Sequence, residues 1–264
     1  MQDAINTIKW TALATLLLSG LSIGGPVFGA SVSDRMIEVQ HVRLVDHLLQ
    51  NVAKKILEAG AESCARHGMH LPAAPPGSAI KDVYYTPGAT TVVTTTLSYE
   101  AAVGCKLERK EKQVITAWTA LGTCVTKPDE KLSTGYCDVD YASLTQFPDK
   151  KFKRNQTELK GASIMIAGHD CINHEISGAM AGRICVARGG TFAKVTNLSF
   201  PNLPLGVILK RESKLVQVTT GSSLIEEAIE IHTDVMIPIT TLLPQLSGKY
   251  RVISHTLPQT DSPQ

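Results

Sequence analysis

The sequence is poor in aromatic residues and in net charge. Phe, Trp and Tyr make up 5% of the 264 residues, and the formal net charge is +2 with 19% charged residues. Few aromatic rings leave little surface on which bases or sugars could stack. A balanced charge creates no strong field toward nucleic acid or an anionic membrane. We therefore expect no nucleic-acid partner.

Signatures of common catalytic and phosphate-binding sites are missing as well. Beyond residue 30, the chain has no Gly-x-Ser-x-Gly elbow, no His-Glu-x-x-His pair and no Gly-x-Gly-x-x-Gly loop. These patterns mark hydrolases, zinc enzymes and nucleotide-binding domains, respectively. The sequence therefore predicts no catalytic residues, no cofactor and no metal.

What the chain does have is an apolar segment near its start. Residues 10–23 form an apolar run after Lys9, and small residues follow at 29–31. This order is typical of a secretory signal peptide, which a signal peptidase would remove near residues 29–31. We assign residues 1–30 to it and expect a periplasmic or secreted protein that meets a membrane only through this segment. An uncleaved anchor is the alternative, although glycines and a proline interrupt the run.

The six cysteines all follow that segment. An even number of cysteines in an exported chain favours disulfides over free thiols or a zinc site. Cys171 and Cys185 lie on the two arms of a hairpin expected over residues 161–190, where they would face each other directly across the ladder. Cys124 and Cys137 flank a turn-rich loop that would bring them together. By elimination, Cys64 pairs with Cys105.

The expected hairpin also offers a competing set of metal ligands. It contains His169, Asp170, Cys171, His174 and Glu175. His169 and His174 are five residues apart, so on a regular strand they project from opposite faces. That parity argues against joint chelation, and export favours the disulfide.

A helix is expected over residues 31–70, in the first part of the mature chain. Apolar residues recur at steps of three and four from Ile37 to Leu57, which is typical of an amphipathic helix. The proline-rich stretch that follows, residues 71–78, predicts an extended linker because prolines exclude helix.

After the linker the pattern changes to that of β-strands. Residues 90–99 are dense in β-branched side chains, which favour extended structure. Charged clusters at residues 110–112 and 211–214 predict the turns of two further hairpins.

The last long strand is expected over residues 225–236. Apolar and polar side chains alternate there, which predicts a half-buried antiparallel strand with Glu226 and Glu230 on its solvated face. The sequence thus predicts an antiparallel β domain over residues 79–255, followed by a disordered tail over residues 256–264.

Four short stretches of the second half resemble the strands of exported bacterial lipoprotein-carrier-like proteins. They lie within residues 161–252 and read IAGHDC (166–171), GRICV (182–186), GVILK (206–210) and AIEI (228–231). That family has a curved antiparallel half-barrel wrapped around helices, with an apolar interior. The resemblance implies non-enzymatic binding of an apolar or lipidated ligand.

The fold class we expect is α+β. A long N-terminal amphipathic helix would pack on a curved antiparallel sheet, an open or half barrel, stapled by disulfides. The first functional hypothesis is an exported cell-envelope binding protein that takes an apolar or lipidated ligand in a sheet cavity. That cavity would be lined by Ile164, Ile166, Val207, Leu209, Ile229 and Ile231.

Two other hypotheses remain open. The chain could be a structural or assembly component of the envelope that binds a partner protein through an apolar stripe of the helix. The stripe would consist of Val42, Val45, Leu49, Val52 and Ile56. The chain could also be an exported metal-binding protein or hydrolase, and stoichiometric metal in the purified protein would favour that metal-dependent form.

Overall fold

A computed structural model describes residues 35–75, 77–146, 163–176, 181–195, 198, 206–214 and 223–254. The predicted signal peptide and the predicted disordered tail lie outside the described residues, so both stay predictions. Among the described residues, no helix is long and apolar enough to cross a bilayer.

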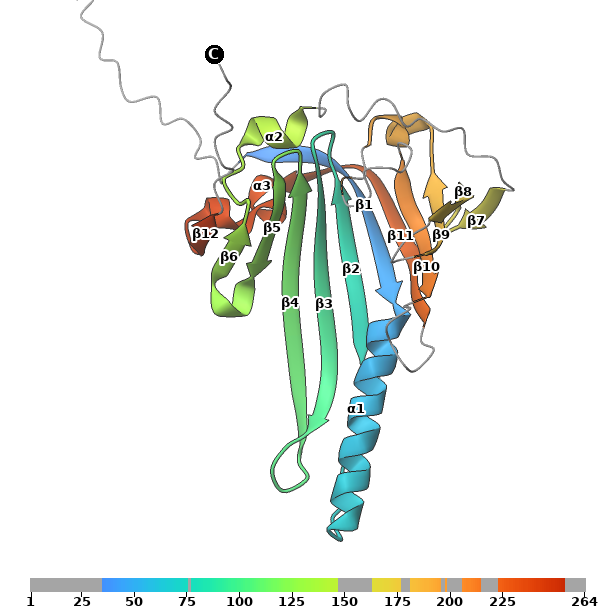
Figure 1. The fold of residues 1–264 in the computed structure, drawn as a ribbon, viewed down its shortest axis with the longest axis vertical. Coiled ribbons are helices and arrows are strands. Elements are labelled where there is room, and N and C mark those ends of the chain that lie inside the picture. Colours follow the sequence, from blue (N-terminus) through green and yellow to red (C-terminus); the bar gives the residue numbers. More distant parts are fainter. Residues whose placement is uncertain are drawn as a thin grey trace, which may run out of the picture. The chain divides into compact units, whose positions relative to one another are not determined.

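The described strands form one open, twelve-stranded sheet (Figure 1). They are β1 (Met36–Asp46), β2 (Ser78–Tyr85), β3 (Ala89–Ala101), β4 (Leu107–Thr119), β5 (Gly122–Lys127), β6 (Leu132–Gly135), β7 (Ser163–Ile166), β8 (His169–Ile176), β9 (Gly182–Ala187), β10 (Val207–Lys214), β11 (Ser223–Pro238) and β12 (Arg251–Ser254). Their order across the sheet is β12-β6-β5-β4-β3-β2-β1-β11-β10-β9-β8-β7. Neighbouring strands are antiparallel, except that β12 runs parallel to β6.

The helices of the described part are fewer and, apart from one, short. They are α1 (His47–Arg66), α2 (Tyr141–Thr145) and α3 (Ile239–Leu242), with 3-10 turns η2 (Pro128–Glu130), η4 (Gly190–Lys194) and η5 (Pro244–Ser247). A mostly antiparallel, open sheet with few helices confirms the coarse fold expected from the sequence.

The long N-terminal helix predicted over residues 31–70 is wrong in its first part, because residues 36–46 form strand β1. This strand is central, and each of its faces is buried over part of its length. Ile37 and Val39 face one core cluster, whereas Val42 and Leu44 face another. Because the buried face changes along the strand, the apolar residues lose the period of two and imitate the three- and four-residue steps of a helix.

The change from β1 to α1 occurs at Asp46, which is almost fully buried. Its Oδ1 accepts a hydrogen bond from the backbone N–H of Leu49 at 3.0 Å, which caps the helix. Its Oδ2 lies 2.6 Å from Nζ of Lys81, and Lys81 also pairs with Glu226. The sequence predicts Glu226 on the solvated face, but it is buried. Its carboxylate can be buried because it pairs with Lys81, which it shares with Asp46.

Helix α1 packs along the end of β3 that β2 does not reach. The last pair between β2 and β3 is Ser78 with Leu97, so residues 98–101 have no partner on β2. Gly60 of α1 lies so close to Ala101 that an added Cβ would stand 2.9 Å from the alanine Cβ. The disulfide between Cys64 and Cys105 joins the last turn of α1 to the β3–β4 connection. The helix thus covers an open strand edge (Figure 1).

The sheet curls at the end that carries β7 to β10. Strands β11 and β7 are in contact, although in a flat sheet four steps of about 4.8 Å would separate them by about 19 Å. The backbone N–H of Ile208 in β10 donates to the phenol oxygen of Tyr85 in β2, at 3.3 Å. Phe192 and Val195, within and just after η4, belong to the core cluster on this face.

The structure contains all three predicted disulfides, Cys64–Cys105, Cys124–Cys137 and Cys171–Cys185. For Cys171–Cys185 the expected register is wrong by two residues, since Cys185 pairs with Asn173 in the β8–β9 ladder. The two cysteines are therefore diagonal neighbours, with Cα atoms 5.4 Å apart. The first arm of the expected hairpin is itself a hairpin, because the chain turns at Ala167 and Gly168, both with positive φ.

The two turns predicted at charged clusters are also wrong. Strand β4 runs straight through residues 110–112, and β10 runs through residues 211–214. The β3–β4 connection falls instead at residues 102–106, where Gly104 and Cys105 have positive φ. Charged side chains on β4 form ion pairs with neighbours two residues along the strand, such as Lys110 with Glu108 at 2.9 Å. A charged cluster is thus compatible with an exposed strand.

Asp46 should be far more important to stability than an exposed capping residue. Asp46→Ala removes the cap and takes from the largely buried Lys81 ammonium one of its two carboxylate partners, so we expect a loss of about 3 kcal/mol or more in the free energy of unfolding. Asp140, which is exposed and caps α2 through Ser143, is the matched control. Asp140→Ala should cost about 1 kcal/mol. Urea denaturation measures both, and equal losses would contradict a buried ionic role for Asp46.

Candidate functional site

The six residues predicted to line an apolar cavity do not share one environment. Ile166, Val207 and Leu209 are buried in the core cluster, and the half-buried Ile231 packs against it. Ile164 and Ile229 are 36% and 57% exposed. Ile229 lies in a bulge of β11 without a partner on β1, which turns it outward. None of the six lines either of the clefts described below, and binding of an apolar ligand among them stays a prediction.

The apolar stripe predicted on the N-terminal helix is divided between two elements. Val42 is fully buried in β1, whereas Val52 and Ile56 on α1 are 44% and 50% exposed. Val45 and Leu49, at the junction, are half-buried. Only the part of the stripe on α1 is thus available to another molecule, and a partner-binding role for it stays a prediction.

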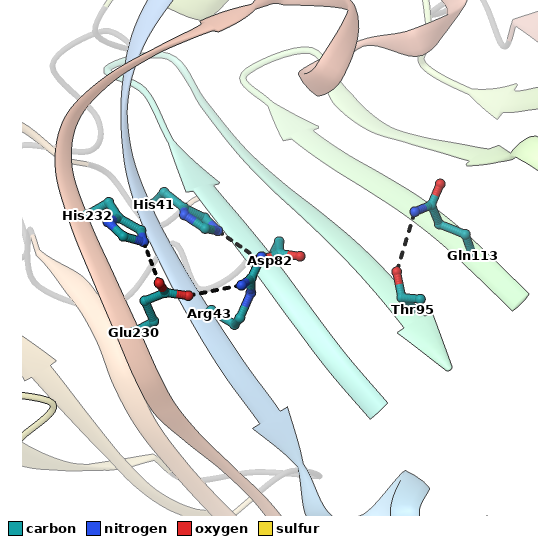
Figure 2. A network of polar contacts seen from close by, with 7 residues as sticks. All are labelled: His41, Arg43, Asp82, Thr95, Gln113, Glu230 and His232. Atoms are coloured by element: carbon teal, nitrogen blue, oxygen red, sulfur yellow. Dashed lines mark hydrogen bonds and ion pairs between the residues drawn. The ribbon is translucent and has the colours of Figure 1, made fainter. Parts of the chain in front are cut away.

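A network of charged side chains crosses β2, β1 and β11, and we call it the charged ladder (Figure 2). It consists of Asp82, His41, Arg43, Glu230 and His232. Nε2 of His41 and Nε of Arg43 each lie 2.8 Å from Oδ1 of Asp82. Arg43 also reaches Glu230 at 2.9 Å, and Glu230 lies 2.9 Å from His232. The strand register produces this arrangement, because His41 pairs with His232 and Arg43 pairs with both Glu230 and Asp82.

Ring stacking and hydrogen bonds hold the charged ladder together. The His41 ring stacks between Tyr84 and His232, with centroids 4.7 and 5.5 Å away. Burial of Asp82 favours its neutral form, but hydrogen bonds from His41 and Arg43, with the charges of both, outweigh burial and lower the pKa of Asp82. These groups already bind one another, which indicates a clamp across three strands.

The described residues do not place a metal-ligand set at the charged ladder or at the hairpin. No three His, Cys, Asp or Glu side chains within the described ranges are positioned to hold a metal ion. In the hairpin, Cys171 is oxidised in its bond to Cys185, so its sulfur is not available as a thiolate ligand.

A cleft of about 430 Å³ opens where β1 passes the β2–β3 turn, and we call it the Gln40 cleft. Strand β1 lines it with residues 37–40, and the β2–β3 turn contributes Thr86 and Pro87. The rest of the lining comes from Tyr85 of β2, from helix α2, from η4 with Val195 just after it, and from Asp234 of β11. Its volume lies in the lower part of the range of about 300–1,000 Å³ that is typical of small-molecule sites.

Gln40 is the unusual residue of this cleft. It is only 7% exposed, and its Nε2 donates to Oδ1 of Asp234 at 2.8 Å. A carboxylate only accepts hydrogen bonds, so this contact fixes the amide with its nitrogen toward Asp234. The amide oxygen Oε1 is then a buried acceptor without a hydrogen-bond partner in the described part of the chain. Such an atom costs about 1–3 kcal/mol if it stays unpaired.

A β-bulge brings Asp234 to Gln40. Val39 pairs with Val235 and His41 with His232, so two residues of β11, Thr233 and Asp234, stand against Gln40 alone. Asp234 has a φ of 58°, which is uncommon for a residue other than glycine but tolerated by Asp and Asn. Bulges of this kind redirect side chains and are frequent next to binding sites.

A second cleft, of about 530 Å³, lies between α1 and the extended segment before β2. Its lining includes Lys54 and Glu58 of α1, Pro75, and Tyr99 of β3. None of the buried unpartnered side-chain atoms found in the described residues belongs to this cleft. Of the two clefts, the Gln40 cleft therefore shows the stronger demand for a bound group.

Comparison with protein-family models, curated proteins and solved structures finds no match for this chain. The case for a function therefore depends on the geometry of the chain's own residues.

Sequence reasoning did not identify Gln40 or Asp234 as site residues. Gln40 stands between Val39 and His41 in β1, where the helical interpretation places it on a solvated face, and Asp234 lies near the end of the expected strand. Their proximity depends on pairing between segments 194 residues apart and on a bulge. No local pattern in the sequence marks either residue.

The charged ladder should make the free energy of unfolding depend on pH. Because the pKa of Asp82 is lowered in the folded state, its contribution is present above its ordinary value of 3.8 and is lost as the pH falls below that value. We expect Asp82→Asn to lower the free energy of unfolding by about 1–3 kcal/mol at pH 7, with the difference shrinking below pH 4. Denaturation curves from pH 7 to pH 2.5 test this. The exposed Asp129→Asn serves as control, and a pH-independent difference would exclude the ionic contribution.

Proposed function

We propose that this chain is an exported binding protein of an oxidising compartment, periplasmic or extracellular, which holds a small ligand in the Gln40 cleft without transforming it. The buried, unpartnered Oε1 of Gln40 carries the proposal. A ligand that donates a hydrogen bond to this oxygen would remove the cost of an unpaired buried acceptor.

The cleft combines apolar and polar groups in the manner of small-molecule sites. Apolar surface comes from Ile37, Val39, Pro87 and Val195, and hydroxyl groups come from threonines on three different segments. Apolar walls with a few placed polar groups bury a ligand and fix its orientation.

The disulfides support the proposed compartment. Each of the six cysteines is paired, and the three bonds join α1 to the β3–β4 connection, β5 to the segment after β6, and β8 to β9. Disulfides of this number persist in exported proteins and are rare in reducing compartments.

Gln40→Met separates a binding role from a structural one. Methionine keeps the length of the side chain but removes the unpartnered oxygen, so the ligand-free variant should gain about 1 kcal/mol in the free energy of unfolding. In a fragment test by ligand-observed NMR, benzylamine, benzyl alcohol and benzamide serve as donor-bearing probes, and toluene serves as a probe without a donor. At least one donor-bearing probe should bind the wild type more tightly than toluene does and lose about tenfold in affinity for the variant.

Gln113→Met is the matched control. Gln113 of β4 is half-buried, donates to Thr95 at 3.4 Å (Figure 2) and does not line the cleft. This variant should bind the fragments like the wild type. Equal binding of every probe to Gln40→Met and the wild type, or a clear loss of stability in Gln40→Met, would show that Gln40 is structural and would overturn the proposal.

A further inference from the structure

The charged groups that line the Gln40 cleft all have one sign. Glu38 and Asp234 contribute carboxylates, and no described lining residue is Lys, Arg or His. Glu38 and Asp234 are exposed, whereas the Gln40 oxygen is buried. A group bound in the cleft therefore meets both negative charge and a hydrogen-bond acceptor.

The Gln40 amide oxygen and the two carboxylates, Glu38 and Asp234, call for a ligand with hydrogen-bond donors and positive charge. The unpartnered Oε1 of Gln40 accepts a hydrogen bond, and a carboxylate can only accept. A neutral hydroxyl satisfies the amide oxygen but leaves the charge of the carboxylates unused. An ammonium or guanidinium group satisfies both, because it carries several N–H donors together with a positive charge.

We infer that the Gln40 cleft selects an organic cation that bears N–H donors on an apolar stem, an inference that rests on the proposed small-ligand function. The cation points its N–H groups at Oε1 of Gln40 and at Asp234, and the stem lies against the apolar walls. A free amine and the side chain of a lysine in a peptide share this chemistry.

One cation of the protein itself lies near the mouth. The guanidinium of Arg35 stands over the ring of Tyr141, 5.4 Å from the ring centre, and Tyr141 lines the cleft. Arg35 is exposed and does not line the cleft, so its charge is screened by solvent. It reduces the attraction for a cation without occupying the site, and Arg35→Gln should bind a cation slightly more tightly than the wild type.

Three probes that share a benzyl group test the inference by calorimetry at low salt. Benzylamine should bind at least tenfold more tightly than benzyl alcohol, which lacks the charge. It should also bind more tightly than benzyltrimethylammonium, which keeps the charge but has no N–H group. Nα-acetyl-lysine methylamide stands for the side chain of a lysine within a peptide. If this probe binds as tightly as benzylamine, a peptide lysine is favoured over a free amine as the ligand.

Asp234→Asn is the decisive variant. Asparagine tolerates the positive φ and still accepts from Gln40, so the cleft should keep its shape while it loses one of its two negative charges. The preference for benzylamine over benzyl alcohol should then fall to about threefold or less. Asp129→Asn, far from the cleft lining, should keep the full preference.

The outcomes distinguish the inference from the proposed function. Equal affinity for benzylamine and benzyl alcohol, with both weakened by Gln40→Met, would overturn cation selectivity and leave small-ligand binding intact. A preference for benzylamine that Asp234→Asn does not reduce would also overturn the inference. Failure of every probe to bind would overturn both.

Discussion

The backbone pairing of β1 with β2 on one side and β11 on the other is the interaction on which the rest of the structure depends. Through this pairing, one strand of eleven residues supplies two separate cores, the middle of the charged ladder and the buried amide of the cleft. Its end at Asp46 also sets the start of α1. A shift of register by one residue would turn each of these side chains to the opposite face.

Features that depend on neighbours close in the chain could be predicted from the sequence. Cys124 and Cys137 flank a short loop, and the β-branched run at residues 90–99 forms most of β3. The helical interpretation of residues 36–46 failed because a strand buried on alternate faces has no simple period. The turns predicted at the charged residues of β4 and β10 were wrong for a related reason. Charged side chains are exposed on β4, and on β10 they are held by ion pairs such as Lys210 with Glu227, so charge does not exclude a strand.

The cleft could not be predicted, because its decisive contact is made by a bulge. No local pattern indicates that Thr233 and Asp234 together oppose Gln40. The polar groups at the centre of the sheet nevertheless follow a common rule. Asp46 and Glu226 share Lys81, Glu226 also lies 3.9 Å from Arg211, and the members of the charged ladder bind one another on the other face. The amide oxygen of Gln40 differs, because it is buried without a hydrogen-bond partner in the described residues. Violations of this kind are expected at functional sites.

The position of α1 along the end of β3 has a consequence for the newly made chain before its disulfides form. Apart from Cys64, the buried residue of α1 is the small Ala53, and Gly60 makes the close contact with Ala101, so the Cys64–Cys105 bond adds a covalent link to a contact made by small side chains. If the helix detached, the backbone groups of residues 98–101 would be free to add a strand from another molecule, the first step of amyloid-like assembly. Oxidative maturation would thus protect newly made chains from one another.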